Sequence, residues 1–172
     1  MKTEEKERLK INVVAAEGQT QPNKGNMLKE KLVKRLEKFL AENEMLGTAA
    51  TAEQIAEAEK ILNVKFPTAY VDFITRFGGT YAGVAIHAFE NASEIGNETV
   101  IELTQNMRQA FGNGDKRQKE AQQSIAFSDD GSGNPILLNS KGEVVIFYHD
   151  CDEREVLASN LGKFIEDNFE EW

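Results

Sequence analysis

Three short apolar segments separated by glycine-containing turns constrain the fold of this chain more than any other feature. The segments cover 125–127, 136–138 and 144–148, and the connections between them cover 129–134 and 140–142. Short apolar runs joined by such turns are typical of consecutive antiparallel strands. The sequence therefore predicts a three-stranded β-meander in the second half of the chain.

Amphipathic helices are predicted before this meander. Residues 27–46 carry leucine and phenylalanine on one face and charged residues on the other, and Gly47 follows as a stop. Thr51 and Gln54 have the spacing of a capping box, which predicts a helix through about residue 62. Pro67 suits the first turn of a third helix, which glycines 78 and 79 end.

The remaining segments complete the pattern. Strand-like alternation runs over 81–89, an amphipathic helix is expected over 100–111, and a last helix is expected from about residue 159. Helices that flank an antiparallel run of strands define an α+β fold. Shared apolar periodicity predicts that the following side chains are buried: Tyr70, Phe73, Ile74, Phe77, Leu103, Phe127, Leu137, Ile146 and Phe164.

We expect two parts along the 172 residues. Leu9, Ile11 and Val13 alternate with polar residues, which predicts a short strand, and the polar segment 18–26 is typical of a linker. Residues 1–26 are thus interpreted as an N-terminal strand and linker. Residues 27–172 are interpreted as one α+β domain, a size that can bury a core without disulfides.

Composition narrows the kinds of partner. The net charge is −9 at pH 7, and residues 150–172 carry eight acidic and two basic side chains. A negative surface opposes nucleic acid and anionic membranes and favours a basic protein partner, although acidic surfaces also simply keep proteins soluble. A charged N-terminus, a single cysteine and no apolar run of about 20 residues predict a cytoplasmic protein that does not enter a membrane.

No pattern of catalytic or metal-binding residues stands out. The only histidines, His87 and His149, have no partner at a catalytic or ligand spacing, and the run 149–152 lacks the second pair of ligands that zinc sites usually draw from elsewhere. The loop that begins at Asp130 has proline at its sixth position and lysine at its twelfth, so it fails the EF-hand pattern. We therefore expect no enzyme activity, no cofactor and no metal.

Two segments together resemble a known family. The first runs from Glu59 to Pro67 and continues with Tyr70, Phe73 and the sequence Phe-Gly-Gly at 77–79. The second is the meander itself, with Asp-Gly-Ser-Gly at 130–133 and Gly-Glu-Val at 142–144. In order and spacing these segments resemble the SUKH superfamily of the Smi/Knr type, over roughly residues 51–169.

The resemblance implies a fold and a role. The implied fold is a curved antiparallel β-sheet flanked by α-helices. The implied role in bacteria is that of a cytoplasmic immunity protein, which binds and neutralises a cognate polymorphic toxin, with a nuclease toxin as the natural candidate for an acidic binder. The alternative implied by the yeast members is a non-enzymatic regulatory scaffold or adaptor that binds a housekeeping protein. The partner is in either case a protein.

The candidate binding surface lies at one end of the meander. In an antiparallel meander the first turn and the exit of the third strand lie at the same end of the sheet. We therefore expect two acidic clusters and two less charged neighbours to form one partner-binding patch, made of Asp129, Asp130, Asn134, Tyr148, Asp150, Asp152 and Glu153. The alternative is a solvated sheet end without a binding role.

Overall fold

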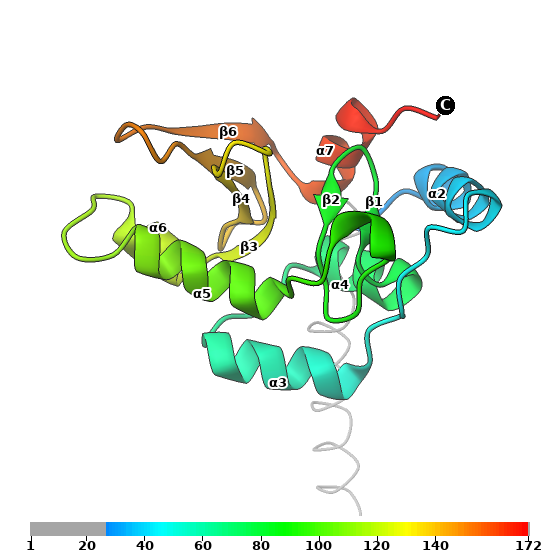
Figure 1. Cartoon of the computed structure of the whole chain (residues 1–172), viewed down its shortest axis with the longest axis horizontal. Coiled ribbons are helices and arrows are strands. Elements are labelled where there is room, and N and C mark those ends of the chain that lie inside the picture. The colour runs from blue at the N-terminus through cyan, green and yellow to red at the C-terminus, as the bar shows by residue number, and fades with distance from the viewer. Residues whose placement is uncertain (1–26, 172) are drawn as a thin grey trace, which may run out of the picture.

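The computed structural model describes residues 27–171, and Figure 1 shows the arrangement of their helices and strands. Before the sheet come α2 (Glu30–Glu42), α3 (Ala52–Leu62), α4 (Thr68–Phe77), a hairpin of β1 (Thr80–Tyr81) and β2 (Ala85–Ile86), a 3-10 turn η1 (Ser93–Ile95), α5 (Val100–Ala110) and α6 (Gln118–Gln122). The second half holds β3 (Ile125–Asp129), β4 (Pro135–Leu138), β5 (Val144–Phe147), β6 (Arg154–Ala158) and α7 (Leu161–Asn168). The predicted α+β fold is confirmed.

The main sheet has four antiparallel strands in the order β3-β4-β5-β6. The predicted meander is present, with Leu138 paired to both Ile125 and Val144. The fourth strand, β6, was not predicted, because it is an exposed edge strand whose first three residues, Arg154, Glu155 and Val156, face water. A charged and exposed strand gives no apolar signal in the sequence.

Both faces of the sheet are buried, each in a different core. One face, which includes Phe127 and Ile146, joins the larger core formed with α2, α4 and α7. The opposite face joins a smaller core with α5 and α6, built from Met107, Phe111, Ala121, Ala126, Leu137, Val145 and Phe147. This double burial explains why β3, β4 and β5 are almost continuously apolar instead of alternating with polar residues.

Buried polar groups attach the flanking elements to the edge strand β3. The Thr104 hydroxyl of α5 accepts a hydrogen bond from the Ala126 amide at 2.9 Å, and the His87 amide donates to the Phe127 carbonyl at the same distance. Tyr70 of α4 donates its hydroxyl to the His87 carbonyl at 2.6 Å. One edge of the sheet is thereby covered, since its backbone groups are satisfied by neighbouring elements.

The glycines that end α4 are required by close backbone packing. At Gly78, φ is +65°, and a Cβ atom would lie 2.4 Å from the Thr48 carbonyl oxygen. At Gly79, a Cβ atom would overlap the side chain of Asn91. Gly78 therefore allows close packing against the segment that follows α2, and Gly79 allows close packing against the segment that follows β2.

Several sequence expectations need adjustment. The helix predicted over 27–46 ends at Glu42, since Asn43 caps the Phe39 carbonyl and Glu44 has a positive φ. The strand predicted over 81–89 is two short strands with a turn at Gly83, and α6 was not predicted. The short strand predicted within 1–26 lies outside the described residues.

The predicted core residues are buried with one exception. Eight of the nine side chains have relative exposures between 0% and 5%. Leu103 is only partly buried and packs at the margin of the smaller core. The exception follows from its position on α5 beside a surface groove, described below.

We expect Phe73→Ala to lower the free energy of unfolding by about 3–5 kcal/mol, because the completely buried ring of α4 would leave a cavity in the larger core. Ile61→Ala, at a side chain that is 48% exposed, is the matched control and should change stability by no more than about 0.5 kcal/mol. Chemical denaturation measures both values. Equal stability of the two variants would contradict the core assignment.

Candidate protein-binding surface

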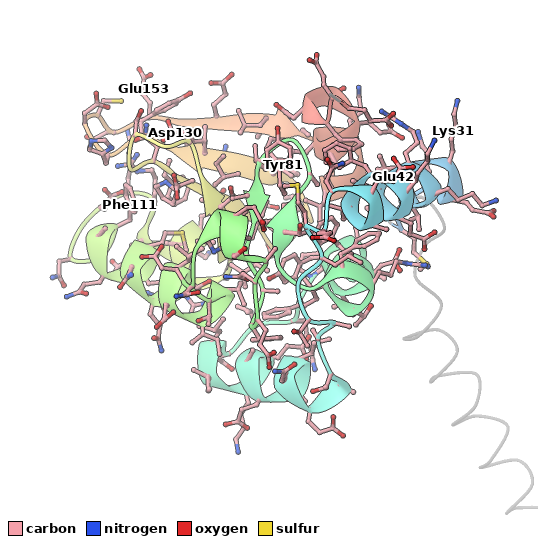
Figure 2. The ribbon with its side chains drawn as sticks, turned by 45° about the vertical axis from the view of Figure 1, so that its right-hand side comes forward. Lys31, Glu42, Tyr81, Phe111, Asp130 and Glu153 are labelled. Carbon is pink, nitrogen blue, oxygen red and sulfur yellow. The ribbon has the colours of Figure 1, made fainter. Side chains whose placement is uncertain are left out.

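The two predicted acidic clusters lie at the same end of the sheet, one in the β3–β4 turn and one in the β5–β6 turn. Figure 2, in which Asp130 and Glu153 are labelled, shows them on one side of the molecule. Asn134 links the turns directly. Its side-chain amide donates to the Asp130 carboxylate at 2.8 Å, and its side-chain oxygen accepts from the His149 amide at 2.9 Å.

The same contacts define the tautomer of His149. Because a carboxylate only accepts, the amide nitrogen of Asn134 must face Asp130, and its oxygen must face His149. The ring nitrogen Nδ1 of His149, 2.6 Å from that oxygen, therefore carries a proton. Asn134 is only 8% exposed, so it acts as a connector between the turns and contributes little surface of its own.

Hydrogen bonds within the β3–β4 turn hold Asp129 and Asp130 in place. Asp130 accepts from the amides of Ser132 and Asn134, and Asp129 accepts from the Gly131 amide at 2.6 Å. Burial raises the pKa of Asp130, but these hydrogen bonds outweigh burial and leave the pKa below its ordinary value. Both carboxylates are exposed.

The β5–β6 turn is held by Arg117, a residue that sequence reasoning missed. Its guanidinium donates to the backbone carbonyls of Tyr148 at 2.9 Å and Glu153 at 2.7 Å. It also pairs with Asp115 and lies over the Phe111 ring, 4.6 Å from the ring centroid. Arg117 is only 5% exposed, whereas its polar surroundings in the sequence are typical of a solvated loop.

The acidic end, as we name Asp129, Asp130, Asp150, Asp152 and Glu153, consists of exposed side chains in two turns fixed from inside. Tyr148 is half-buried, and its hydroxyl donates to the Glu155 carboxylate at 2.8 Å. The structure thus brings all seven predicted residues to one end of the sheet. A rigid backbone beneath exposed charges is suited to binding because little order is lost on docking.

An apolar groove lies beside the acidic end, between α5 and the start of β4. We call it the α5 groove; its volume is about 320 Å³. Leu103 and Met107 of α5 line it together with Phe111, which follows the helix. Pro135 and His149 line it from the sheet end, and Asp129 belongs to its rim. Sequence reasoning missed the groove, since its walls come from three separate segments and its leucine was assigned to the core.

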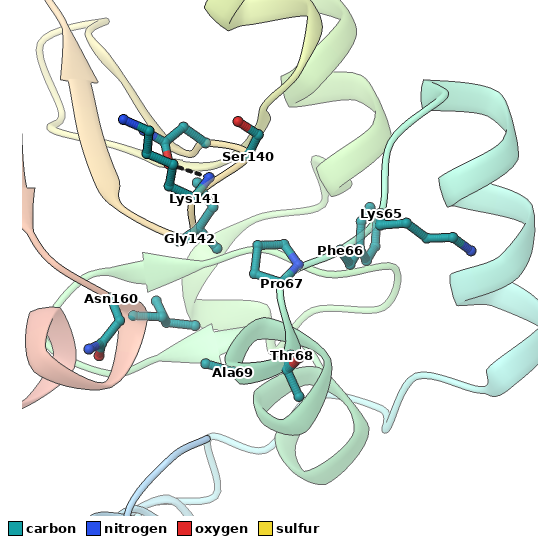
Figure 3. A pocket seen from close by; sticks show the side chains of 12 residues that line it. Lys65, Phe66, Pro67, Thr68, Ala69, Ser140, Lys141, Gly142 and Asn160 are labelled. Atoms are coloured by element: carbon teal, nitrogen blue, oxygen red, sulfur yellow. Dashed lines mark hydrogen bonds between the residues drawn. The ribbon is translucent and has the colours of Figure 1, made fainter. Parts of the chain in front are cut away.

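A second hollow, of about 260 Å³, lies between the start of α4 and the β4–β5 turn (Figure 3). Lys65, Pro67, Ser140, Lys141 and Asn160 line it, with other residues of the same segments. Its two lysines give it the opposite charge from the acidic end. Among the residues that line this hollow, no buried side-chain nitrogen or oxygen lacks a hydrogen-bond partner, so none is free to hold a ligand.

Neither a cluster of metal ligands nor a membrane-spanning helix is found among residues 27–171. Within residues 27–171, no three histidine, cysteine, aspartate or glutamate side chains come close enough to hold a metal ion. His87 is buried, and its ring nitrogen Nδ1 lies 2.7 Å from the Glu98 carbonyl. None of the described helices is long and apolar enough to cross a membrane.

The described residues define an α+β domain of the SUKH type, in which a four-stranded antiparallel sheet is surrounded by helices. The chain belongs to the SMI1 / KNR4 family (SUKH-1), which matches residues 49–167. The match includes α3 to α7 and confirms the resemblance seen in the sequence. A comparison with curated protein sequences finds no significant match.

The structure gives physical roles to the residues that carried the resemblance. Glu59 accepts from the Phe66 amide at 2.9 Å and from the Lys65 ammonium at 3.0 Å, so it fixes the connection that leads into α4.

The family is generally made of non-enzymatic domains of the immunity type, which bind protein partners.

Because of the ion pair between Asp115 and Arg117, the free energy of unfolding should depend on pH in the acid range. The side-chain hydrogen bond from Arg117 lowers the pKa of Asp115 from 3.8 to about 2. A depressed pKa in the folded state stabilises the fold above about pH 4, and this contribution is lost as the pH falls through about 2. The melting temperatures of the native chain and Asp115→Asn should therefore differ at pH 7 and converge towards pH 2. A difference that stays constant over this range would contradict the role of the pair.

We expect removal of divalent metal to leave the fold unchanged. The Asp130 carboxylate is occupied by three N–H donors, so it has little capacity left for a metal ion. The melting temperature in excess EDTA should equal that in buffer, and elemental analysis should find no stoichiometric calcium or zinc. A lower melting temperature in EDTA would show that a structural metal is present.

Proposed function

We propose that this chain is a cytoplasmic immunity protein, which binds a cognate polymorphic toxin and blocks it without catalysis. The observation that carries the proposal is membership of the SMI1 / KNR4 family over residues 49–167. The net charge of −9 supports a basic partner, and a nuclease is a suitable class because its substrate is an anion. Residues 27–172 act as the binding domain.

The acidic end is the proposed contact surface. Its carboxylates would lie against lysine and arginine side chains of the toxin, where they compete with the phosphates of a nucleic acid substrate. Complementary charge accelerates association and selects the partner, whereas packed anchors supply most of the affinity. Arg117 and Asn134 support this mechanism, since they hold both turns without using the exposed carboxylates of the β5–β6 turn.

The test uses residues whose removal spares the turns. Asp130 is unsuitable, because its carboxylate holds the β3–β4 turn. In the other turn, Asp150, Asp152 and Glu153 are exposed, and all three can be replaced with lysine. A control with the same change in net charge replaces exposed glutamates far from the site, namely Glu42, Glu57 and Glu94.

We expect co-expression of the native chain to restore growth to cells that express the toxin encoded by a neighbouring gene. The triple variant of the acidic end should lose protection and associate at least about tenfold more slowly, with a weaker dependence on salt, whereas the control should protect. Full protection by the triple variant at normal expression would exclude the acidic end as the interface. If the native chain gives no protection and instead captures a housekeeping protein, the regulatory scaffold is the correct function.

A further inference from the structure

The α5 groove is an apolar hollow that adjoins the acidic end. Its walls are formed by Leu103, Met107 and Phe111, and by Pro135 across from them. Its volume of about 320 Å³ lies within the range of roughly 300–1,000 Å³ that is typical of ligand sites. Leu103 is partly exposed here although its position on α5 predicts burial, so filling the groove would remove apolar surface from water.

The rim of the groove carries negative charge. Asp129 is part of the lining, and Asp130 follows it in the same turn. His149 forms another part of the wall, and its ring is held by Asn134, which also binds Asp130. The apolar hollow and the acidic end therefore form one continuous surface with a fixed geometry.

We propose that the α5 groove receives a bulky apolar side chain of the protein partner, carried on a segment in which lysine or arginine flanks that side chain. Charge complementarity selects this occupant, because an apolar segment with acidic neighbours would be repelled at the rim. The inference deepens the proposed function and rests on it for the partner being a protein. In this binding mode the groove supplies most of the affinity, and the carboxylates at its rim select the partner.

The chemistry of the groove agrees with how protein interfaces obtain affinity. A few apolar or aromatic anchors in desolvated pockets dominate binding, and a charged rim around them contributes mainly to rate and specificity. Exposed carboxylates on their own give little affinity at physiological salt. The groove supplies the desolvated site that the acidic end lacks.

Peptide titration of the full chain tests the groove without any toxin. The probes are a pentapeptide with tryptophan between two pairs of lysines, the same peptide with central glycine, and a tryptophan peptide flanked by glutamates. Backbone amide shifts in NMR spectra measure the binding. We expect the basic tryptophan peptide to bind about tenfold or more tightly than the glycine peptide and to shift amides of α5 and the β3–β4 turn. Equal affinity of the two basic peptides would overturn the proposal.

Filling the groove supplies the second measurement. Ala110 is exposed and lines the groove, so Ala110→Phe should occupy it and abolish the preference for tryptophan over glycine. Asn106→Phe, at another exposed lining position of α5, serves as a second variant if the first is poorly folded. Ala41→Phe, at an exposed position of α2, is the matched control and should keep the preference. A preference that survives in both groove variants would contradict the assignment.

The outcomes separate failure of the groove from failure of the proposed function. If the native chain and the folded groove variants protect cells equally against the toxin, the groove proposal is wrong and the immunity function stands. If the peptide preference is observed but the native chain protects against no toxin, the proposed function is wrong and the groove remains a binding site. Self-association of the native chain that Ala110→Phe abolishes would assign the groove to a second copy and overturn the proposal.

Discussion

Burial of β3, β4 and β5 on both faces is the constraint on which the rest of the structure depends. Phe127 and Ile146 pack into the larger core, whereas Ala126, Val145 and Phe147 pack into the smaller one. A sheet covered on both sides needs helices from separate parts of the chain, and α5 with α6 provides the second cover. The hydroxyl of Thr104 accepts a hydrogen bond from the Ala126 amide and so fixes the position of α5 against β3.

The candidate binding surface is a consequence of this arrangement. The smaller core ends where Phe111 and Phe147 meet, and the guanidinium of Arg117 lies over both rings. The same guanidinium donates to the carbonyls of the β5–β6 turn. Arg117 therefore both packs against the smaller core and fixes an exposed acidic turn. The α5 groove opens beside the same core, since α5 leaves part of the sheet end uncovered.

Family membership and surface chemistry contribute different parts of the functional argument. The SMI1 / KNR4 family (SUKH-1) defines the fold and the general kind of partner. A fold shared by many proteins does not select one partner, because recognition lies in the side chains at the surface. In the binding mode proposed for this chain, those side chains are the carboxylates of two fixed turns and the apolar lining of the groove between them and α5.

The sequence by itself determined the α+β class, the meander, the capped helix at Thr51 and the burial of residues such as Phe73, because these depend on local periodicity and turn chemistry. It also placed the two acidic turns at one end of the sheet. Only the tertiary structure decided that Asn134 is a buried connector, that Arg117 holds a distant turn and that Leu103 borders a groove. These roles arise from contacts between segments far apart in the chain, for which a single sequence carries no local signal.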